Sequence, residues 1–198
     1  MSKYKIILAS NSPRRRELLK GLDVDFTVRV IPGIDESYPV GLSPAEVPCY
    51  IARRKAEAYL ATLSNNELLI TADTVVILDN EIIEKPVDRA DAIGMLRRLS
   101  GRKHLVITAV VLTTTNRQKE FSAESTVDFT ELRDDEIFYY VDKYKPFDKA
   151  GAYGIQEWIG YVAVQGIEGS FYNVMGLPIQ RLYREILRFD DDPVSLKA

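Results

Sequence analysis

Apolar and polar positions predict strands and helices along nearly the whole chain. Apolar runs and period-two alternation predict strands at 5–10, 26–31, 68–78, 81–83, 104–112, 121–129 and 157–164. Apolar residues three and four positions apart predict helices that begin at Pro13 and cover 48–63, 88–99, 134–144 and 179–187. Because strands and helices mix without strict alternation, we expect an α/β fold, with a mixed twisted sheet and flanking helices.

The stretch 68–86 (LLITADTVVILDNEIIEKP) is typical of a β-hairpin, but it contains an acid that a strand disfavours. Apolar residues flank Asp73 on both sides, and Asp79-Asn80 predict the turn. A carboxylate loses both β propensity and hydration in such a place. Asp73 therefore needs a partner, a metal ion or a chemical role. Glu84 and Lys85 end the returning strand, where a hairpin would fold them back toward Asp73.

Composition narrows the class of protein. The chain has 198 residues, of which 46% are hydrophobic and 28% charged, as expected for a soluble globular protein. No apolar run has the length of a membrane span or of a signal-peptide core. The single cysteine, Cys49, cannot form an internal disulfide, which favours a cytoplasmic location. The one histidine, His104, is expected to have a structural or solvent role, and a Cys/His zinc site is excluded. The net charge of −3 argues against nucleic acid.

Cationic residues gather at the start of the first predicted helix, in the segment SNSPRRR at 10–16. Ser12 is a good N-cap and Pro13 a good first helical residue. Helix N-termini bind anions, whereas arginines in the first turn oppose the helix dipole. A bound anion therefore explains these arginines better than the helix does; solvated arginines on a surface helix are the alternative. Lys55 is either a snorkelling side chain or a second anion contact.

The unusual residues form one set of cations and one set of acids. Polyphosphate chemistry uses both, because cations and a divalent metal neutralise phosphate oxygens while carboxylates hold the metal and accept a proton from water. A nucleoside triphosphate with Mg²⁺ therefore fits better than a neutral substrate. The cations are Arg14, Arg15, Lys55, Lys85 and Lys149, and the acids are Glu36, Asp73 and Glu84.

The chain resembles the Maf family of nucleoside triphosphate pyrophosphatases. Each matching segment is a weak signal, but together they occur in family order over nearly the whole chain. They are SNSPRR at 10–15, ARRKA at 52–56, ADTVV at 72–76, EKP at 84–86, LSG at 99–101, DKAGAYGIQ at 148–156 and GLP at 176–178. Thr71 departs from the pattern, since glycine is frequent there.

The resemblance implies a fold like that of inosine triphosphate pyrophosphatases, with two lobes around a cleft. It also implies one Maf-like domain, which we place at 1–189, and a homodimer. The residues from Asp190-Asp191-Asp192-Pro193 onward predict a flexible tail over 190–198. The implied reaction hydrolyses a nucleoside triphosphate between the α and β phosphates and serves house-cleaning of the nucleotide pool. Arg14, Thr74 and Gln156 match the pyrimidine branch, which acts on dTTP and UTP and on some modified uridine triphosphates. A nucleotide-binding regulator of septum formation is the alternative.

The resemblance also assigns roles to single residues. Asp73 is expected to be the general base, and the metal, Mg²⁺ or Mn²⁺, is expected on Glu36, Asp73 and Glu84. Gln156 carries an amide that both donates and accepts hydrogen bonds, as a uracil or thymine edge demands. Thr74 would complete the selectivity. The residues expected to bind the triphosphate are Ser10, Arg14, Arg15, Lys55 and Lys85.

Overall fold

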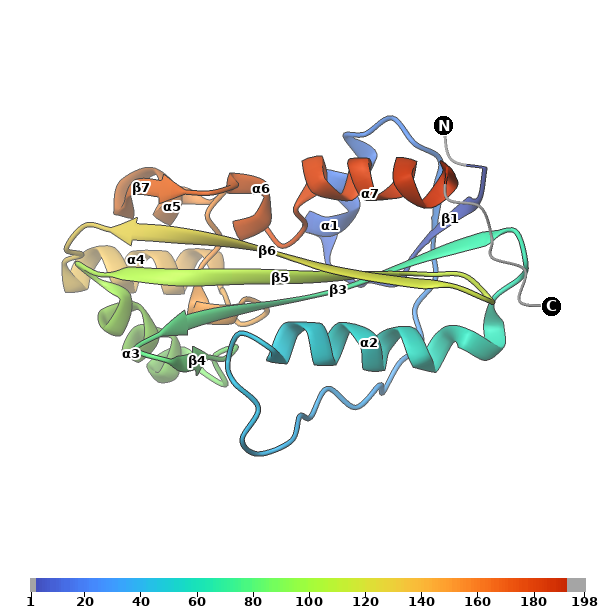
Figure 1. The fold of residues 1–198 in the computed structure, drawn as a ribbon. Helices are drawn as coiled ribbons and strands as arrows, with labels where there is room; N and C mark the ends of the chain where they lie inside the picture. Colours follow the sequence, from blue (N-terminus) through green and yellow to red (C-terminus); the bar gives the residue numbers. More distant parts are fainter. Residues whose placement is uncertain (1–2, 192–198) are drawn as a thin grey trace. The chain divides into compact units, whose positions relative to one another are not determined.

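The computed structural model describes residues 3–191, which form a mixed α/β structure around one sheet (Figure 1). Within these residues the sheet has seven strands, in the order β2-β1-β3-β5-β6-β7, with β4 paired to β3. The predicted fold class is confirmed. The strands are β1 (Lys5–Leu8), β2 (Phe26–Val28), β3 (Glu67–Leu78), β4 (Glu81–Ile83), β5 (Lys103–Thr113), β6 (Gln118–Phe129) and β7 (Val164–Glu168).

Seven α-helices and two 3₁₀ helices join these strands in the described part of the chain. The α-helices are α1 (Pro13–Lys20), α2 (Val47–Tyr59), α3 (Arg89–Leu99), α4 (Asp134–Tyr144), α5 (Trp158–Ala163), α6 (Phe171–Val174) and α7 (Ile179–Asp191). The 3₁₀ helices are η1 (Leu60–Thr62) and η2 (Ala150–Ala152). No helix among the described residues is long and apolar enough to cross a membrane.

The chain divides into two compact units. Of the described residues, the first unit takes 3–73, 108–122 and 176–191, and the second takes 74–107 and 123–175. β3, β5 and β6 each continue from one unit into the other. In β3 the division falls between Asp73 and Thr74, so the two neighbouring residues predicted to serve catalysis and selectivity belong to different units.

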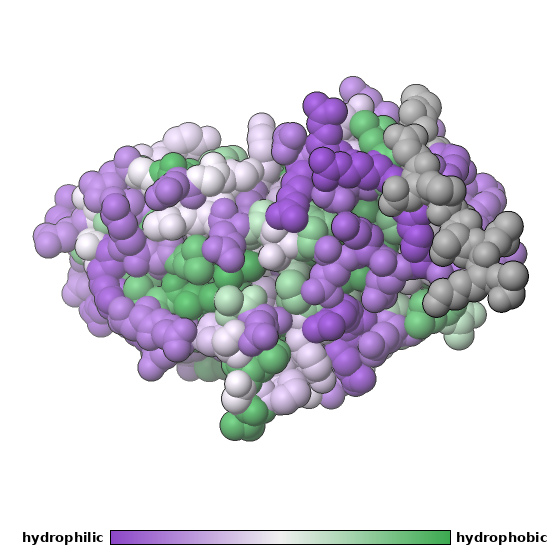
Figure 2. All heavy atoms as spheres, in the orientation of Figure 1, coloured by the Kyte–Doolittle hydropathy of each residue, from purple (hydrophilic) through white to green (hydrophobic). Residues whose placement is uncertain are grey.

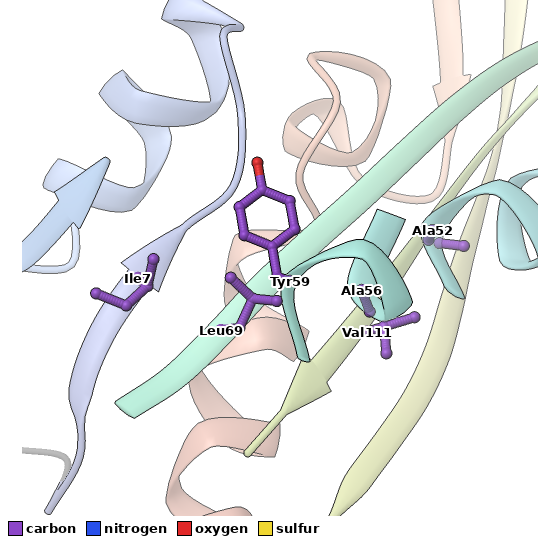
Figure 3. Packing of buried hydrophobic residues seen from close by; sticks show 7 residues of the cluster. Ile7, Ala52, Ala56, Tyr59, Leu69 and Val111 are labelled. Carbon is purple, nitrogen blue, oxygen red and sulfur yellow. The ribbon is translucent and has the colours of Figure 1, made fainter. Parts of the chain in front are cut away.

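The first unit is built on two parallel strand pairs. β1 pairs with β2 and with β3, and Ile7 lies opposite Leu69 in the register with β3. Helix α2 covers an apolar cluster that contains Tyr59, one of the largest wholly buried side chains (Figure 3). Apolar burial of this kind supplies most of the stability of a parallel sheet. The cluster comprises Ile7, Ala52, Ala56, Tyr59, Leu69, Ala109 and Val111.

The long strand β3 is paired on one edge by two different partners, with an opening between them. β1 pairs with residues 67–70, and β4 pairs antiparallel with residues 76–78. Residues 71–75 pair with neither. Thr71 Oγ1 donates to the Ala52 carbonyl oxygen at 2.8 Å, and Asp73 receives a salt bridge from Lys55. Because these polar groups have partners, the strand continues through them, and Thr74 is the one residue of β3 that is not buried.

The second unit contains the helices with the clearest sequence signals. Asp88 caps α3 by accepting a hydrogen bond from the Asp91 backbone N–H at 2.8 Å, so the helix begins where the sequence predicts. Helix α4 spans the predicted residues, with Arg133 rather than Asp134 as its N-cap. His104 lies buried between Phe129 and Tyr153, and its Nε2 lies 2.7 Å from the Tyr153 hydroxyl, so the expected structural role is confirmed.

The prediction of a strand over 157–164 is wrong, because most of this segment forms helix α5 and the strand β7 begins only at Val164. Its Trp, Ile, Tyr and Val residues favour a strand by propensity. The helix, however, brings Ile159 and Ala163 together in the core, four residues apart and fully buried. Gly160 lies so close to the preceding loop that an added Cβ would stand 1.7 Å from the Ile155 carbonyl oxygen. Tertiary packing therefore overrides local propensity here.

Helix α7 closes the first unit with an apolar stripe. Leu182, Ile186 and Phe189 are buried, whereas Tyr183 is 41% exposed. The outer face carries Arg181, and hydrophilic residues gather over α7 in Figure 2. The tail predicted from residue 190 overlaps the last turn of α7 as far as residue 191, and 192–198 lie outside the described residues.

Candidate functional site

Lys55 joins the two acids that were predicted to share a site. It lies on α2, and its Nζ is 2.9 Å from Asp73 Oδ1 and 3.1 Å from Glu36 Oε1. The two carboxylate oxygens are therefore at most about 6 Å apart, the sum of these distances. Asp73 and Lys55 have side chains that are only 12% and 14% exposed, whereas Glu36 is 47% exposed. Such a pair of acids, held by one cation and open on one side, can take up a second cation or a polar ligand.

Arg15 on α1 lies beside these acids, fixed by backbone oxygens. Its Nε donates to the Gly176 carbonyl at 2.7 Å, and its Nη1 donates to the Ala72 carbonyl at 2.9 Å. The second bond lies in the opening of the β3 ladder. Burial lowers the pKa of Arg15. The negative charge of Asp73 acts to raise this pKa, the positive charge of Arg14 lowers it further, and the charge of Glu36 raises it. Arginine stays charged despite such a shift. Arg15 therefore holds a permanent positive charge at the carbonyl of Ala72, the residue before Asp73.

The start of α1 is organised by two serines, as its sequence predicts. Ser12 is the N-cap, and its Oγ accepts from the Arg15 backbone N–H at 3.5 Å. The buried Ser10 accepts from the Ser12 backbone N–H at 3.1 Å through its Oγ, and Arg16 donates to the Ser10 carbonyl. Of the arginines in this turn, Arg15 and Arg16 thus bind backbone carbonyls. The alternative of freely solvated arginines therefore does not describe these two, while Arg14 is half-buried.

The loop that carries Glu36 is anchored by Tyr59, four residues after Lys55 on α2. The Tyr59 hydroxyl accepts from the Ile31 backbone N–H at 2.8 Å and donates to the Arg29 carbonyl at 3.2 Å. Figure 3 shows this hydroxyl pointing out of the apolar cluster. Ile31 and Ile34 pack against the same cluster. One helix therefore supplies both Lys55 and the support of the Glu36 loop, a link that no pattern in the sequence indicated.

The remaining predicted residues belong to the second unit. Thr74 is half-buried on β3, while Glu84 and Lys85 are exposed just after β4. The Glu84 carbonyl accepts from the Gly151 N–H at 3.1 Å, which ties the end of β4 to the loop 146–157. Gly151 has a φ of +69°, and an added Cβ would stand 3.1 Å from both methyl groups of Val76, so glycine is required there.

Gln156 lies in the same loop with an unused acceptor. Its Oε1 is buried and has no hydrogen-bond partner among residues 3–191. A buried amide oxygen without a partner costs about 1–3 kcal/mol, which a ligand donor would recover. The prediction that Gln156 reads a base edge stays a prediction, but the structure supplies the acceptor that such a reader needs.

A network next to Gln156 escaped the sequence analysis. The buried Tyr140 on α4 donates from its hydroxyl to Glu157 Oε2 and accepts from the Gly154 N–H at 3.0 Å. Lys149 Nζ lies 3.2 Å from Glu157 Oε1 and 2.8 Å from Asp148 Oδ1, with only 8% of its side chain exposed. Burial, and then the bond to Glu157, raise the pKa of Tyr140, which keeps it a neutral donor. Both charges around Lys149 are negative, so it is already paired within the loop.

The structure thus brings six of the predicted residues into the first unit, where they surround the start of α1 and the pair Asp73–Lys55. Four others lie in the second unit, on β3, after β4 and in the loop before α5. No group of three potential metal ligands of the Asp, Glu, His or Cys type occurs among residues 3–191. The first set is Ser10, Arg14, Arg15, Glu36, Lys55 and Asp73, and the second is Thr74, Glu84, Lys85 and Gln156.

Comparisons with known proteins identify the family of this chain. A family model described as Maf-like protein matches residues 5–189. A dTTP/UTP pyrophosphatase of Bacteroides thetaiotaomicron is 60% identical and spans 94% of this chain and 96% of its own. A dTTP/UTP pyrophosphatase of Parabacteroides distasonis is 59% identical over 96% of this chain and 98% of its own.

One solved structure supports the fold independently. A HAM1 protein from Coxiella burnetii aligns with a TM-score of 0.50 over 93% of this chain and 99% of its own, at 16% identity. At that identity the likeness concerns the fold alone. The family match over nearly the whole sequence and the relatives of about 60% identity confirm the resemblance inferred from the motifs: the chain belongs to the family of Maf-like proteins.

Proposed function

We propose that this protein is a nucleoside triphosphate pyrophosphatase that hydrolyses dTTP and UTP to the monophosphate and pyrophosphate. Close relatives carry that name over nearly the full length of both chains. The observation that carries the proposal is the pairing of a largely buried Asp73 with Lys55, with Glu36 on the same ammonium and Arg15 beside them. A strand disfavours a buried acid unless it has such a role. Modified uridine triphosphates are further candidate substrates.

The donor set in the first unit fits a divalent cation of the Mg²⁺ or Mn²⁺ type. Mg²⁺ is usually held in proteins by one or two carboxylates, with water and substrate phosphates completing its shell. Asp73 and Glu36 are two carboxylates that share the Lys55 ammonium, and the role of Glu84 as a third ligand stays a prediction. When bound, the metal would neutralise charge on the phosphate oxygens and orient the triphosphate.

The chain's own residues then have distinct tasks. Asp73 accepts the proton of the water that attacks phosphorus, and the bond to the departing pyrophosphate breaks. Lys55 moves its ammonium between the acids and the phosphate oxygens, and Arg14, Ser10 and Lys85 bind the triphosphate. Arg15, whose Nε and Nη1 bind backbone carbonyls, contributes its charge as well as any direct contact.

Base selectivity is assigned to Gln156 and Thr74 of the second unit and to Arg14 of the first. Gln156 offers the N3–H of uracil or thymine a buried acceptor that is unpaired in the described part of the chain, and its amide N–H groups can donate to a ring carbonyl. A base that cannot match this edge leaves the amide unpaired, at a cost of about 1–3 kcal/mol. Thr74 and Arg14 complete the selectivity.

The test is product analysis with the purified protein, UTP or dTTP and Mg²⁺. We expect pyrophosphate and the monophosphate; orthophosphate and the diphosphate would overturn the mechanism. Asp73→Asn should reduce turnover by at least about a hundredfold, because general-base catalysis contributes on this scale, while nucleotide binding persists. Asp79→Asn, in the exposed β3–β4 turn, is the matched control and should keep the wild-type rate. The homodimer and the cytoplasmic location stay predictions.

A further inference from the structure

Gln156 sits in a tight turn whose two ends share one anchor. The Glu157 backbone N–H donates to the Gly154 carbonyl at 2.9 Å, so Ile155 and Gln156 occupy the loop between them. The Tyr140 hydroxyl accepts from the Gly154 N–H at 3.0 Å and donates to the Glu157 carboxylate. A single hydroxyl group from α4 therefore holds both flanks of the turn that presents Gln156.

The anchor is itself fixed from two sides. Tyr140 is wholly buried, and its ring stacks on Tyr144 with centroids 5.1 Å apart. The second oxygen of Glu157 pairs with the buried Lys149 at 3.2 Å. Space at the turn is tight as well, since a Cβ on Gly154 would stand 3.0 Å from the Glu157 carboxyl carbon. The side chains leave the turn little freedom to shift.

This rigidity matters because Gln156 has little else to hold its amide in place. Its Oε1 has no hydrogen-bond partner within the described residues. A flexible amide reader loses selectivity when its backbone moves, since a displacement of about 1 Å is enough to spoil aligned hydrogen bonds. Yet the loop contains Gly151 and Gly154, which permit many backbone conformations. The selectivity of the reader therefore depends on what fixes the turn.

We propose that Tyr140 and Glu157 are positioning residues that set pyrimidine-base selectivity by holding the Gln156 turn. Neither needs to contact the nucleotide, and Lys149 serves them as the counter-charge of Glu157. The proposal rests on the proposed function, because it assumes that Gln156 reads the base. It predicts that loosening the Gln156 turn lowers the preference for one pyrimidine base over another, while hydrolysis at Asp73 and Lys55 continues.

The experiment compares UTP with CTP, whose rings have the same size but opposite hydrogen-bonding edges. Tyr140→Phe removes the hydroxyl and keeps the ring. We expect the ratio of kcat/KM for UTP over CTP to fall about tenfold, mainly through a higher KM for UTP, with kcat changed less than about threefold. Tyr144→Phe, one turn along α4 in the same aromatic stack, is the control and should leave the ratio unchanged.

A double-mutant cycle with Gln156→Ala separates positioning from a general loss of structure. If Tyr140 acts through Gln156, then Tyr140→Phe should not lower the UTP/CTP ratio further when Gln156 is already alanine. An unchanged ratio in Tyr140→Phe, or the same fall in both backgrounds, would overturn the proposal. If Tyr140→Phe does not fold, Glu157→Gln replaces it in the test. This substitution keeps an acceptor for Tyr140 but weakens the pairing with Lys149, so it should also lower the UTP/CTP ratio. An unchanged ratio in Glu157→Gln would equally overturn the proposal.

Binding of the monophosphates distinguishes this proposal from the proposed function. UMP and CMP affinities are measured by calorimetry in the wild type and in Tyr140→Phe. If the wild type prefers UMP but releases no pyrophosphate from UTP, the proposed reaction is refuted. The positioning role still stands in that case, provided that Tyr140→Phe loses the preference for UMP. A wild type without any preference for UMP, or a variant that keeps it, would refute the positioning role itself.

Discussion

Lys55→Met tests whether the two acids around Lys55 form a cation site. The substitution keeps most of the aliphatic stem and removes the ammonium that lies 2.9 Å from Asp73 and 3.1 Å from Glu36. The ammonium and a divalent metal would occupy neighbouring positions on the same two carboxylates. Its removal should therefore destabilise the protein without metal and strengthen the binding of metal.

The size of the effect follows from the geometry. Two unit charges about 6 Å apart repel by about 3 kcal/mol at an effective dielectric constant of 20 and by about 0.7 kcal/mol in water. Because Glu36 is 47% exposed, we expect the lower half of this range, about 1 kcal/mol. Relief of that repulsion by a metal corresponds to about fivefold tighter binding in the variant than in the wild type.

The assay is urea denaturation followed by circular dichroism, in EDTA and across a series of Mn²⁺ concentrations. In EDTA the midpoint of Lys55→Met should lie below that of the wild type, and Mn²⁺ should raise it by more than it raises the wild-type midpoint. Arg54→Met, an exposed neighbour on α2, is the control and should shift little. Equal stabilisation of wild type and Lys55→Met by Mn²⁺ would refute the reasoning, since the acids would then not bind the metal together.

Two further predictions concern stability in the second unit. Burial lowers the pKa of His104 to about 4, below the ordinary value near 6.5. The unfolded chain therefore binds a proton that the folded one excludes, so stability should fall by up to about 3 kcal/mol as the pH drops from 6.5 to 4. Denaturation midpoints across this range should show a steeper slope for the wild type than for His104→Phe; identical slopes would contradict the assignment. Gly160→Ala should lower the melting temperature severely or prevent folding, because its Cβ would meet the Ile155 carbonyl at 1.7 Å, whereas Gly94→Ala, in open space on α3, should not.

Local signals in the sequence were sufficient for much of the fold. The Ser12 cap with Pro13 located α1, and Asp88 located the start of α3, because capping depends on neighbouring residues alone. The segment after Glu157 failed for the opposite reason. Its residues favour a strand, and only the burial of Ile159 and Ala163 against the rest of the unit makes it a helix.

The candidate site likewise combines a residue that the sequence singles out with residues that only the fold brings together. Asp73 was conspicuous in the sequence because an acid within an apolar strand is costly. Its partner Lys55 and the second acid Glu36 come from elements 18 and 37 residues away, so their meeting depends on the register of β3 and on the packing of α2. Tyr140 gave no signal beyond its place on an apolar helix face, since its proposed role arises from one hydroxyl that binds the Gly154 N–H and the Glu157 carboxylate of a turn distant in the sequence.

The opening in the β3 ladder has a consequence for how such an enzyme can diverge. Residues 71–75 pair with neither β1 nor β4, so exchanging the side chain of Thr74 disturbs no strand pairing on that edge. Inserting or deleting one residue before Asp73 would instead turn Asp73 to the other face of the sheet, because side chains alternate along a strand. A point substitution at Thr74, the proposed selectivity residue, therefore leaves the placement of Asp73 intact, whereas a change in the length of β3 before Asp73 separates the proposed base from its partner Lys55.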